Sequence, residues 1–167
     1  MLAFVLLGPS LMGCGLLSSV EQCKQLADVL EQAKAELATP LPANPPASIV
    51  RARADNYRKL TAQLKRLKLD KELDKNRDLL VRHLLTISQH LNAAADAVTH
   101  AAQDNTTLDT DTPPPQPAVD PTPGPTAAAL RSKQRAHVRR YLQAKTDIEA
   151  TSVKVAETMH RLNLDCH

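Results

Sequence analysis

Apolar residues recur at alternating spacings of three and four along four stretches of this chain, which is the spacing of one face of an α-helix. We expect helices over about 18–37, 47–69, 70–103 and 126–164. A very short link joins the second helix to the third, which favours antiparallel packing of that pair. The residues expected to face the core are Val20, Cys23, Ala27, Leu30 and Leu37 in the first helix; Val50, Tyr57, Leu60, Leu64 and Leu67 in the second; Leu73, Leu80, Leu84, Ile87, Leu91, Ala94, Val98 and Ala101 in the third; and Val138, Tyr141, Ile148, Val155, Met159, Leu162 and Cys166 in the fourth.

Capping residues and the scarcity of glycine support this helical prediction. Asp70 is expected to be the N-cap of the third helix, and Ser19 forms a capping-box pattern with Gln22 at the start of the first. Aromatic residues make up only 2% of the chain, and none of its four glycines falls between Leu16 and Thr122. Because hairpins and βα turns rely on glycine, we predict an all-α fold, an antiparallel up-and-down four-helix bundle.

A proline-rich segment, residues 104–125, separates the third and fourth helices. It contains seven of the 12 prolines and four Asp residues, but no Lys or Arg. This composition does not bury enough apolar surface to become ordered, so we expect a disordered linker that acts as a plain tether. A docking segment for a proline-binding partner is the alternative. The predicted organisation places helices one to three in 14–103, the linker in 104–125 and the fourth helix of the same bundle in 126–167.

The first twenty residues carry no charge and resemble an export signal in their order. An apolar run, Leu2–Leu7, is broken at Gly8-Pro9 and followed by Leu11-Met12-Gly13-Cys14. A secretory signal combines an apolar run of about 7–15 residues with a small residue before the cleavage site, usually after a positively charged start. Here no Lys or Arg precedes the run. A broken transmembrane span, an uncleaved secretory signal and a buried first helix of a cytosolic protein are the alternatives.

The tetrapeptide Leu11-Met12-Gly13-Cys14 resembles the lipobox of bacterial lipoproteins. The resemblance implies that residues 1–13 are a signal peptide and that Cys14 then carries lipid, palmitate included. The pattern over Tyr57–Leu73, an early cysteine and a cysteine at the extreme C-terminus are similar to small helical lipoproteins of Gram-negative bacteria, a group with no assigned activity. The glycine after the lipid-bearing cysteine resembles an outer-membrane sorting signal. The implied location is the bacterial cell envelope, with a lipid anchor in the outer membrane and the protein facing the periplasm.

Two cysteines remain if Cys14 is acylated. Cys23 lies near the start of the first helix and Cys166 at the end of the fourth. In an up-and-down bundle these two ends lie at the same pole, and exported cysteine pairs usually oxidise. We therefore expect a Cys23–Cys166 disulfide, with buried free thiols as the alternative.

Motifs of catalysis and of cofactor binding are missing from the sequence. It contains no G-x-S-x-G, glycine-rich phosphate loop or H-E-x-x-H motif. His83 and His90 are two helical turns apart, roughly 10 Å, which is too far to hold one metal ion. The C-terminus nearly matches the C-x-x-C-H pattern of haem attachment, but Asn163 replaces the first cysteine. We predict no enzyme activity, no metal and no cofactor.

A basic stretch, Arg51–Arg82, is the one unusual surface feature, with eleven Lys and Arg residues against five acidic ones. Nucleic acid is not an expected partner, because stacking aromatic residues are missing and an exported protein meets little of it. Anionic lipid, lipopolysaccharide or an acidic protein fits this charge better, with an ordinary solvated helix face as the alternative. The predicted basic surface consists of Arg51, Arg53, Arg58, Lys59, Lys65 and Arg66.

These observations predict a non-enzymatic, lipid-anchored envelope protein that presents a helical bundle to another envelope protein or to the envelope surface. The alternative function is a periplasmic bundle that binds or senses a small apolar ligand between splayed helices. An apolar cavity near Lys145 and Ser152, which interrupt the stripe of the fourth helix, would favour this alternative. A solid core at that position would reject it.

Overall fold

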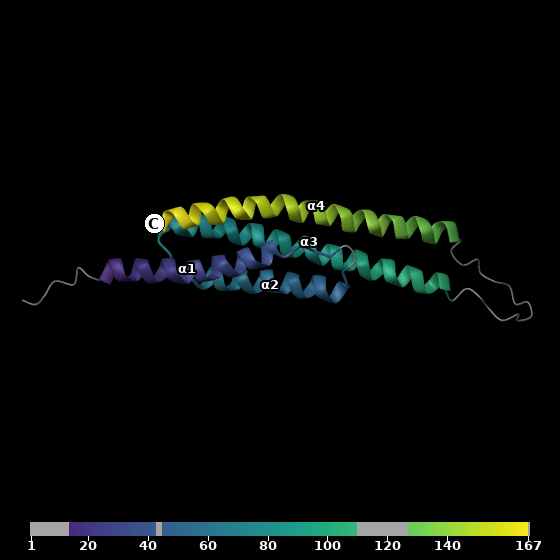
Figure 1. Cartoon of the computed structure of the whole chain (residues 1–167), viewed down its shortest axis with the longest axis horizontal. Coiled ribbons are helices and arrows are strands. Elements are labelled where there is room, and N and C mark those ends of the chain that lie inside the picture. Colours follow the sequence, from purple (N-terminus) through teal and green to yellow (C-terminus); the bar gives the residue numbers. More distant parts are fainter. Residues whose placement is uncertain (1–13, 43–44, 110–126, 167) are drawn as a thin grey trace, which may run out of the picture.

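The computed structural model describes residues 14–42, 45–109 and 127–166, which form four α-helices packed against one another (Figure 1). They are α1 (Cys14–Ala38), α2 (Ala47–Arg66), α3 (Lys71–Asp109) and α4 (Ala127–Asp165). These described residues contain no strand, so the predicted all-α class is confirmed. α3 and α4 have 39 residues each and lie along one another, and at the end away from the C-terminus they extend past the shorter α1 and α2 (Figure 1).

Three helix ends differ from the prediction, and one of them is the end of α2, at Arg66 instead of near Leu69. α1 begins at Cys14, so Ser19 lies inside the helix and its predicted role as an N-cap is wrong. α3 continues to Asp109 instead of ending near Gln103. At the end of α3 no proline stops the helix, since the next proline is Pro113. The rest of the predicted linker, residues 110–125, lies outside the described residues.

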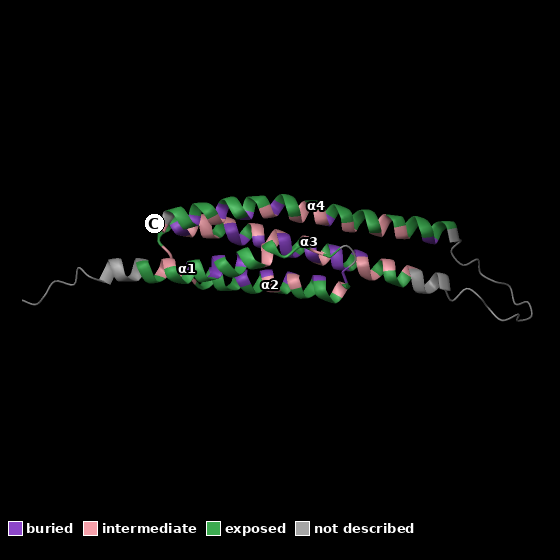
Figure 2. Cartoon of the chain, viewed as in Figure 1, coloured by how far each residue is buried: buried purple, intermediate pink, exposed green. Residues whose placement is uncertain are grey.

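The core consists mainly of the predicted stripes of α2 and α3. In α2, Val50, Tyr57, Leu60 and Leu64 are buried. The buried positions of α3 are Leu73, Leu80, Leu84, Ile87, Leu91 and Ala94. Figure 2 shows these buried positions on the inner faces of the helices, with exposed residues along the outside. The helical period of three and four therefore predicted most of both faces, although Leu67, Val98 and Ala101 are only partly buried.

The predicted stripes of α1 and α4 are partly wrong. In α1, Val20 is 67% exposed and Ala27 is exposed, while Leu26, Val29 and Ala33 are buried. The predicted α1 stripe faces α4, and α4 packs mainly on α3 and only sparsely on α1. In α4, Val138 is 49% exposed.

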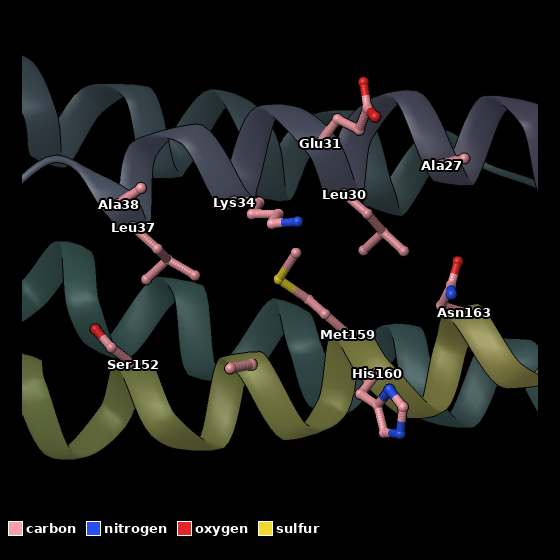
Figure 3. Close-up of a pocket in the computed structure, with 11 residues that line it drawn as sticks. Ala27, Leu30, Glu31, Lys34, Leu37, Ala38, Ser152, Met159, His160 and Asn163 are labelled. Atoms are coloured by element: carbon pink, nitrogen blue, oxygen red, sulfur yellow. The ribbon is translucent and has the colours of Figure 1, made fainter.

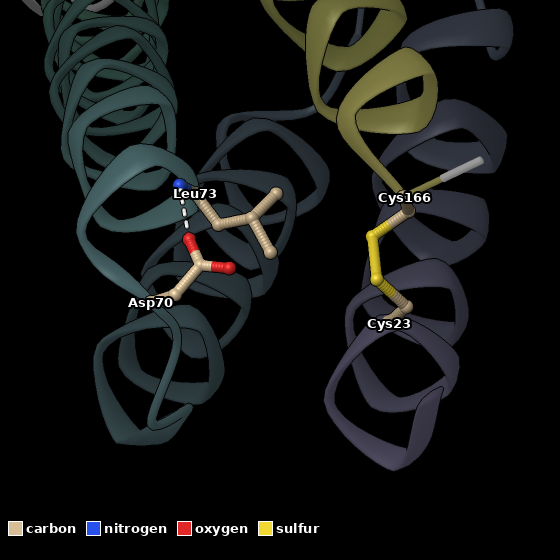
Figure 4. Close-up of a disulfide and its surroundings, with 4 residues drawn as sticks. All are labelled: Cys23, Asp70, Leu73 and Cys166. Carbon is tan, nitrogen blue, oxygen red and sulfur yellow. Dashed lines mark hydrogen bonds between the residues drawn. A yellow bond between two sulfur atoms is a disulfide. The ribbon is translucent and has the colours of Figure 1, made fainter. Parts of the chain in front are cut away.

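The predicted disulfide between Cys23 and Cys166 is present (Figure 4). Their Cα atoms are 5.6 Å apart, although 143 positions separate them in the chain. Asp70 lies at the same end of the molecule and caps α3, as predicted: its Oδ1 accepts hydrogen bonds from the backbone N–H groups of Leu73 (3.0 Å) and Glu72 (3.1 Å). One end of the structure is thus held by a covalent bond and a helix cap.

Polar contacts hold the connection between α1 and α2 in place. Arg53 of α2 donates to the backbone carbonyl of Glu36, and the Asn56 side chain donates to the Glu36 carboxylate at 2.8 Å. The Tyr141 hydroxyl of α4 donates to the carbonyl oxygen of Pro42 at 3.3 Å.

Within their described residues, none of the helices has a stretch that is both long and apolar enough to cross a bilayer.

Candidate functional site

A groove of about 610 Å³ lies between α1 and α4 (Figure 3). The side chains of Leu30, Leu37 and Met159 point into it, and they give it an apolar wall on both sides. The remainder of the walls combines small residues with polar and charged ones. The lining residues are Ala27, Leu30, Glu31, Lys34, Leu37, Ala38, Ser152, Ala156, Met159, His160 and Asn163.

The sequence of the two helices explains why this space stays open. Ala27 of α1 and Ala156 of α4 both line the groove, and a methyl group on either helix is too short to fill the space between them. The larger apolar residues Leu26 and Val29 of α1 are buried in the core instead. The disulfide at Cys23 ties α1 to α4 at one end of this groove.

The charged groups of the groove are unevenly placed. In Figure 3 the Lys34 amino group lies in the groove between α1 and Met159, whereas the Glu31 carboxylate and the His160 ring point away. Lys34 makes no ion pair within the part of the chain that the structure describes. The groove therefore combines an apolar surface with an uncompensated positive charge.

A second hollow, of about 370 Å³, continues from the groove and shares Leu37 and Ser152 with it. It also contains Lys145. The protein therefore has an opening near Lys145 and Ser152, where a cavity was expected to favour ligand binding and a solid core to reject it. Arg53 and Tyr57 form its inner side. Burial raises the pKa of the Tyr57 hydroxyl, which keeps this phenol neutral at physiological pH.

The residues of the predicted basic surface have different environments. Arg51 pairs with Asp96 at 3.1 Å and Arg58 with Asp55 at 3.1 Å, so these two charges are partly compensated. The Arg53 side chain is only 14% exposed and forms an ion pair with Glu36 at 3.9 Å, so it does not belong to an open surface. The three that remain exposed, without an ion pair in the described part of the chain, are Lys59, Lys65 and Arg66.

Histidines form contacts across α3 and α4 that the sequence analysis missed. The rings of His100 and His137 stack with centroids 5.4 Å apart, and His137 Nε2 lies 3.4 Å from an Asp104 carboxylate oxygen. Cross-helix pairs such as these have no local sequence signal, because their spacing depends on the register of two helices. Over the described residues, no group of three or more His, Cys, Asp or Glu side chains is arranged to hold a metal ion.

The predicted lipidation residue, Cys14, is the first residue of α1. The predicted signal peptide, residues 1–13, lies outside the described residues. No protein-family model, no curated protein and no solved structure has a significant match to this chain. Functional proposals therefore depend on the residues and geometry of this protein itself.

Proposed function

We propose that this protein is a non-enzymatic lipoprotein of the bacterial cell envelope, anchored through lipid on Cys14. The proposal is supported by Leu11-Met12-Gly13-Cys14, with its apolar run before it and a glycine after it. Two or more acyl chains on one protein give stable membrane attachment, whereas a single chain binds only marginally. The glycine after Cys14 favours the outer membrane, with the protein facing the periplasm.

The domain presented by this anchor is, in our proposal, an antiparallel up-and-down bundle with a disordered proline-rich linker between α3 and α4. Three contacts support this topology. The Cys23–Cys166 bond joins the beginning of α1 to the end of α4. The Asn56–Glu36 hydrogen bond joins the end of α1 to the first half of α2. Serine 88, in the middle of α3, donates to the Ala54 carbonyl of α2 at 2.9 Å.

The surface presented to the envelope is proposed to be the end of the molecule that contains the last turn of α2. Lys65 and Arg66 lie in this turn, close in sequence to Asp70, which lies at the same end as the disulfide (Figure 4). α1 leads from this end toward Cys14. A lipid anchor and exposed cations at one end favour contact with anionic headgroups, at about 1 kcal/mol for each Lys or Arg near the surface.

Palmitate labelling in a bacterial host tests the anchor. The unmodified chain is expected to incorporate label and to sediment with membranes, and Cys14→Ala is expected to lose both. Ser19→Ala is the matched control and keeps both. Equal labelling and sedimentation of Cys14→Ala would overturn the anchor.

Vesicle binding tests the basic end. The full-length chain with Cys14→Ser is expected to bind vesicles containing phosphatidylglycerol, and the double change Lys65→Glu and Arg66→Glu to weaken this binding by about tenfold or more. The matched double change Arg131→Glu and Lys133→Glu alters exposed residues near the start of α4. An equal effect of the two double changes would contradict a membrane-facing role for the end of α2.

A second candidate function is a periplasmic bundle that binds a small ligand. The open groove between α1 and α4, together with the hollow at Lys145 and Ser152, favours it. The groove volume of about 610 Å³ falls within the range of small-molecule sites. The two functions are compatible in one protein, since the groove and the end of α2 involve different residues.

A further inference from the structure

We propose that the groove between α1 and α4 binds a long-chain carboxylic acid, with the chain against Leu30, Leu37 and Met159 and the carboxylate paired with Lys34. This inference rests on the second candidate function and is independent of the lipid anchor on Cys14.

The apolar part of the ligand follows from the groove walls. Leu30 and Leu37 project from α1 and Met159 projects from α4 toward the same space (Figure 3). Methionine has a flexible and polarizable side chain that adapts to irregular apolar partners. Because the groove shares Leu37 with the hollow beside Ile148, the two together form an elongated space with apolar side chains along it. Such a path suits a linear hydrocarbon chain.

The acidic headgroup follows from Lys34, an exposed lysine that lines the groove. The Lys34 amino group lies over this apolar surface, and Lys34 has no ion pair among the described residues. Glu31, one turn before it, turns its carboxylate away from the groove (Figure 3). A carboxylate on the ligand supplies the missing opposite charge and forms a charge-assisted hydrogen bond to the ammonium group.

The size of the groove favours a slender ligand over a helix from a protein partner. Sites for small-molecule ligands have volumes of about 300–1,000 Å³. The groove volume is about 610 Å³, and the Cys23–Cys166 bond limits how far α1 and α4 separate at one end. A single hydrocarbon chain enters this space without displacing either helix.

Fluorescence titration with 11-(dansylamino)undecanoic acid tests the proposal on the full-length chain carrying Cys14→Ser. Binding is expected to be saturable, with one site per chain. Ala156→Trp fills the groove from an exposed position on α4 and is expected to weaken binding roughly tenfold or more. Ala150→Trp, at an exposed position outside the groove lining, is the matched control and leaves binding unchanged.

The carboxylate contact is tested by Lys34→Gln and by the methyl ester of the same probe. Lys34→Gln is expected to weaken binding of the acid about three- to fivefold and to leave binding of the ester unchanged. Lys24→Gln, at an exposed α1 position outside the groove, changes neither. Circular dichroism of each variant verifies that it is folded.

Three outcomes would overturn the proposal. They are a lack of saturable binding by the folded chain, equal binding by the Ala156→Trp and Ala150→Trp variants, and equal affinity for the acid and its ester. A concentration-dependent dimer that Ala156→Trp abolishes would show that the groove is occupied by a second copy instead. None of these results affects the lipid labelling of Cys14. The experiments therefore distinguish a failure of this proposal from a failure of the lipid anchor.

Discussion

Cys23 and Cys166 are bonded to each other across 143 positions of sequence, with their Cα atoms 5.6 Å apart. The bond joins α1 to α4, two helices that otherwise pack only sparsely on one another. A cross-link over so long a loop lowers the conformational entropy of the unfolded chain. It also keeps the groove between these helices from opening at one end.

Reduction of this disulfide is expected to destabilise the protein by about 2–5 kcal/mol. Urea unfolding with and without reductant measures the difference, and the double variant Cys23→Ser and Cys166→Ser should match the reduced protein. Reductant should have no further effect on that variant. An identical urea midpoint for the oxidised and reduced wild-type chain would contradict a stabilising role for the bond.

Loss of the α3 cap is expected to have a smaller effect. Asp70→Ala removes the acceptor for the backbone N–H groups of Leu73 and Glu72 and should cost about 1 kcal/mol of unfolding free energy. Asp28→Ala removes an exposed carboxylate of α1 and should stay within about 0.5 kcal/mol of wild type. Urea unfolding compares the two variants, and equal stabilities would argue against the cap.

The core of α3 is expected to carry much of the stability. Leu84 is fully buried, so Leu84→Ala should cost about 2–5 kcal/mol through lost burial and the cavity that remains. Leu142 of α4 is 53% exposed, and Leu142→Ala should cost less than about 1 kcal/mol. Thermal or urea unfolding that ranks the two variants in the opposite order would contradict the described core.

Stability is expected to fall with acidification through His83. Burial lowers the pKa of this imidazole, and the nearby Lys154 and Arg82 lower it further. The folded state then binds a proton less readily than the unfolded state, whose imidazole titrates near pH 6.5. Neutral His83 therefore contributes to the free energy of unfolding above that pH. This contribution is lost as the pH falls through the lowered pKa that His83 has in the folded state.

His83→Gln should therefore lose less stability than the wild type between pH 7 and pH 5. Urea unfolding at both values measures the difference, and His160→Gln, at an exposed position, controls for the loss of an imidazole. A larger loss in His83→Gln than in wild type would reverse the expected sign.

Local pattern predicted the parts of this fold that depend on local rules. The stripes of α2 and α3 follow helical periodicity, and Asp70 caps α3 through residues two and three positions away. The disulfide was predictable because helix order alone brings Cys23 and Cys166 to one end. In each case the determining spacing can be read along the chain.

The groove and the buried face of α1 depend on packing between helices and were not predictable in the same way. Leu26 and Ala27 are adjacent apolar residues, and the position of α1 relative to α2 and α4 decides that Leu26 is buried while Ala27 lines the groove. The His100–His137 stack depends likewise on the register of α3 against α4.

Intact-mass spectrometry of the native protein, extracted from the membranes of its host, tests the envelope account most directly. We expect a chain that begins at Cys14, carries the added mass of several acyl groups at that residue, and loses two hydrogens relative to the reduced mass because Cys23 and Cys166 are bonded. A water-soluble protein that keeps Met1 and has an unmodified Cys14 would contradict it.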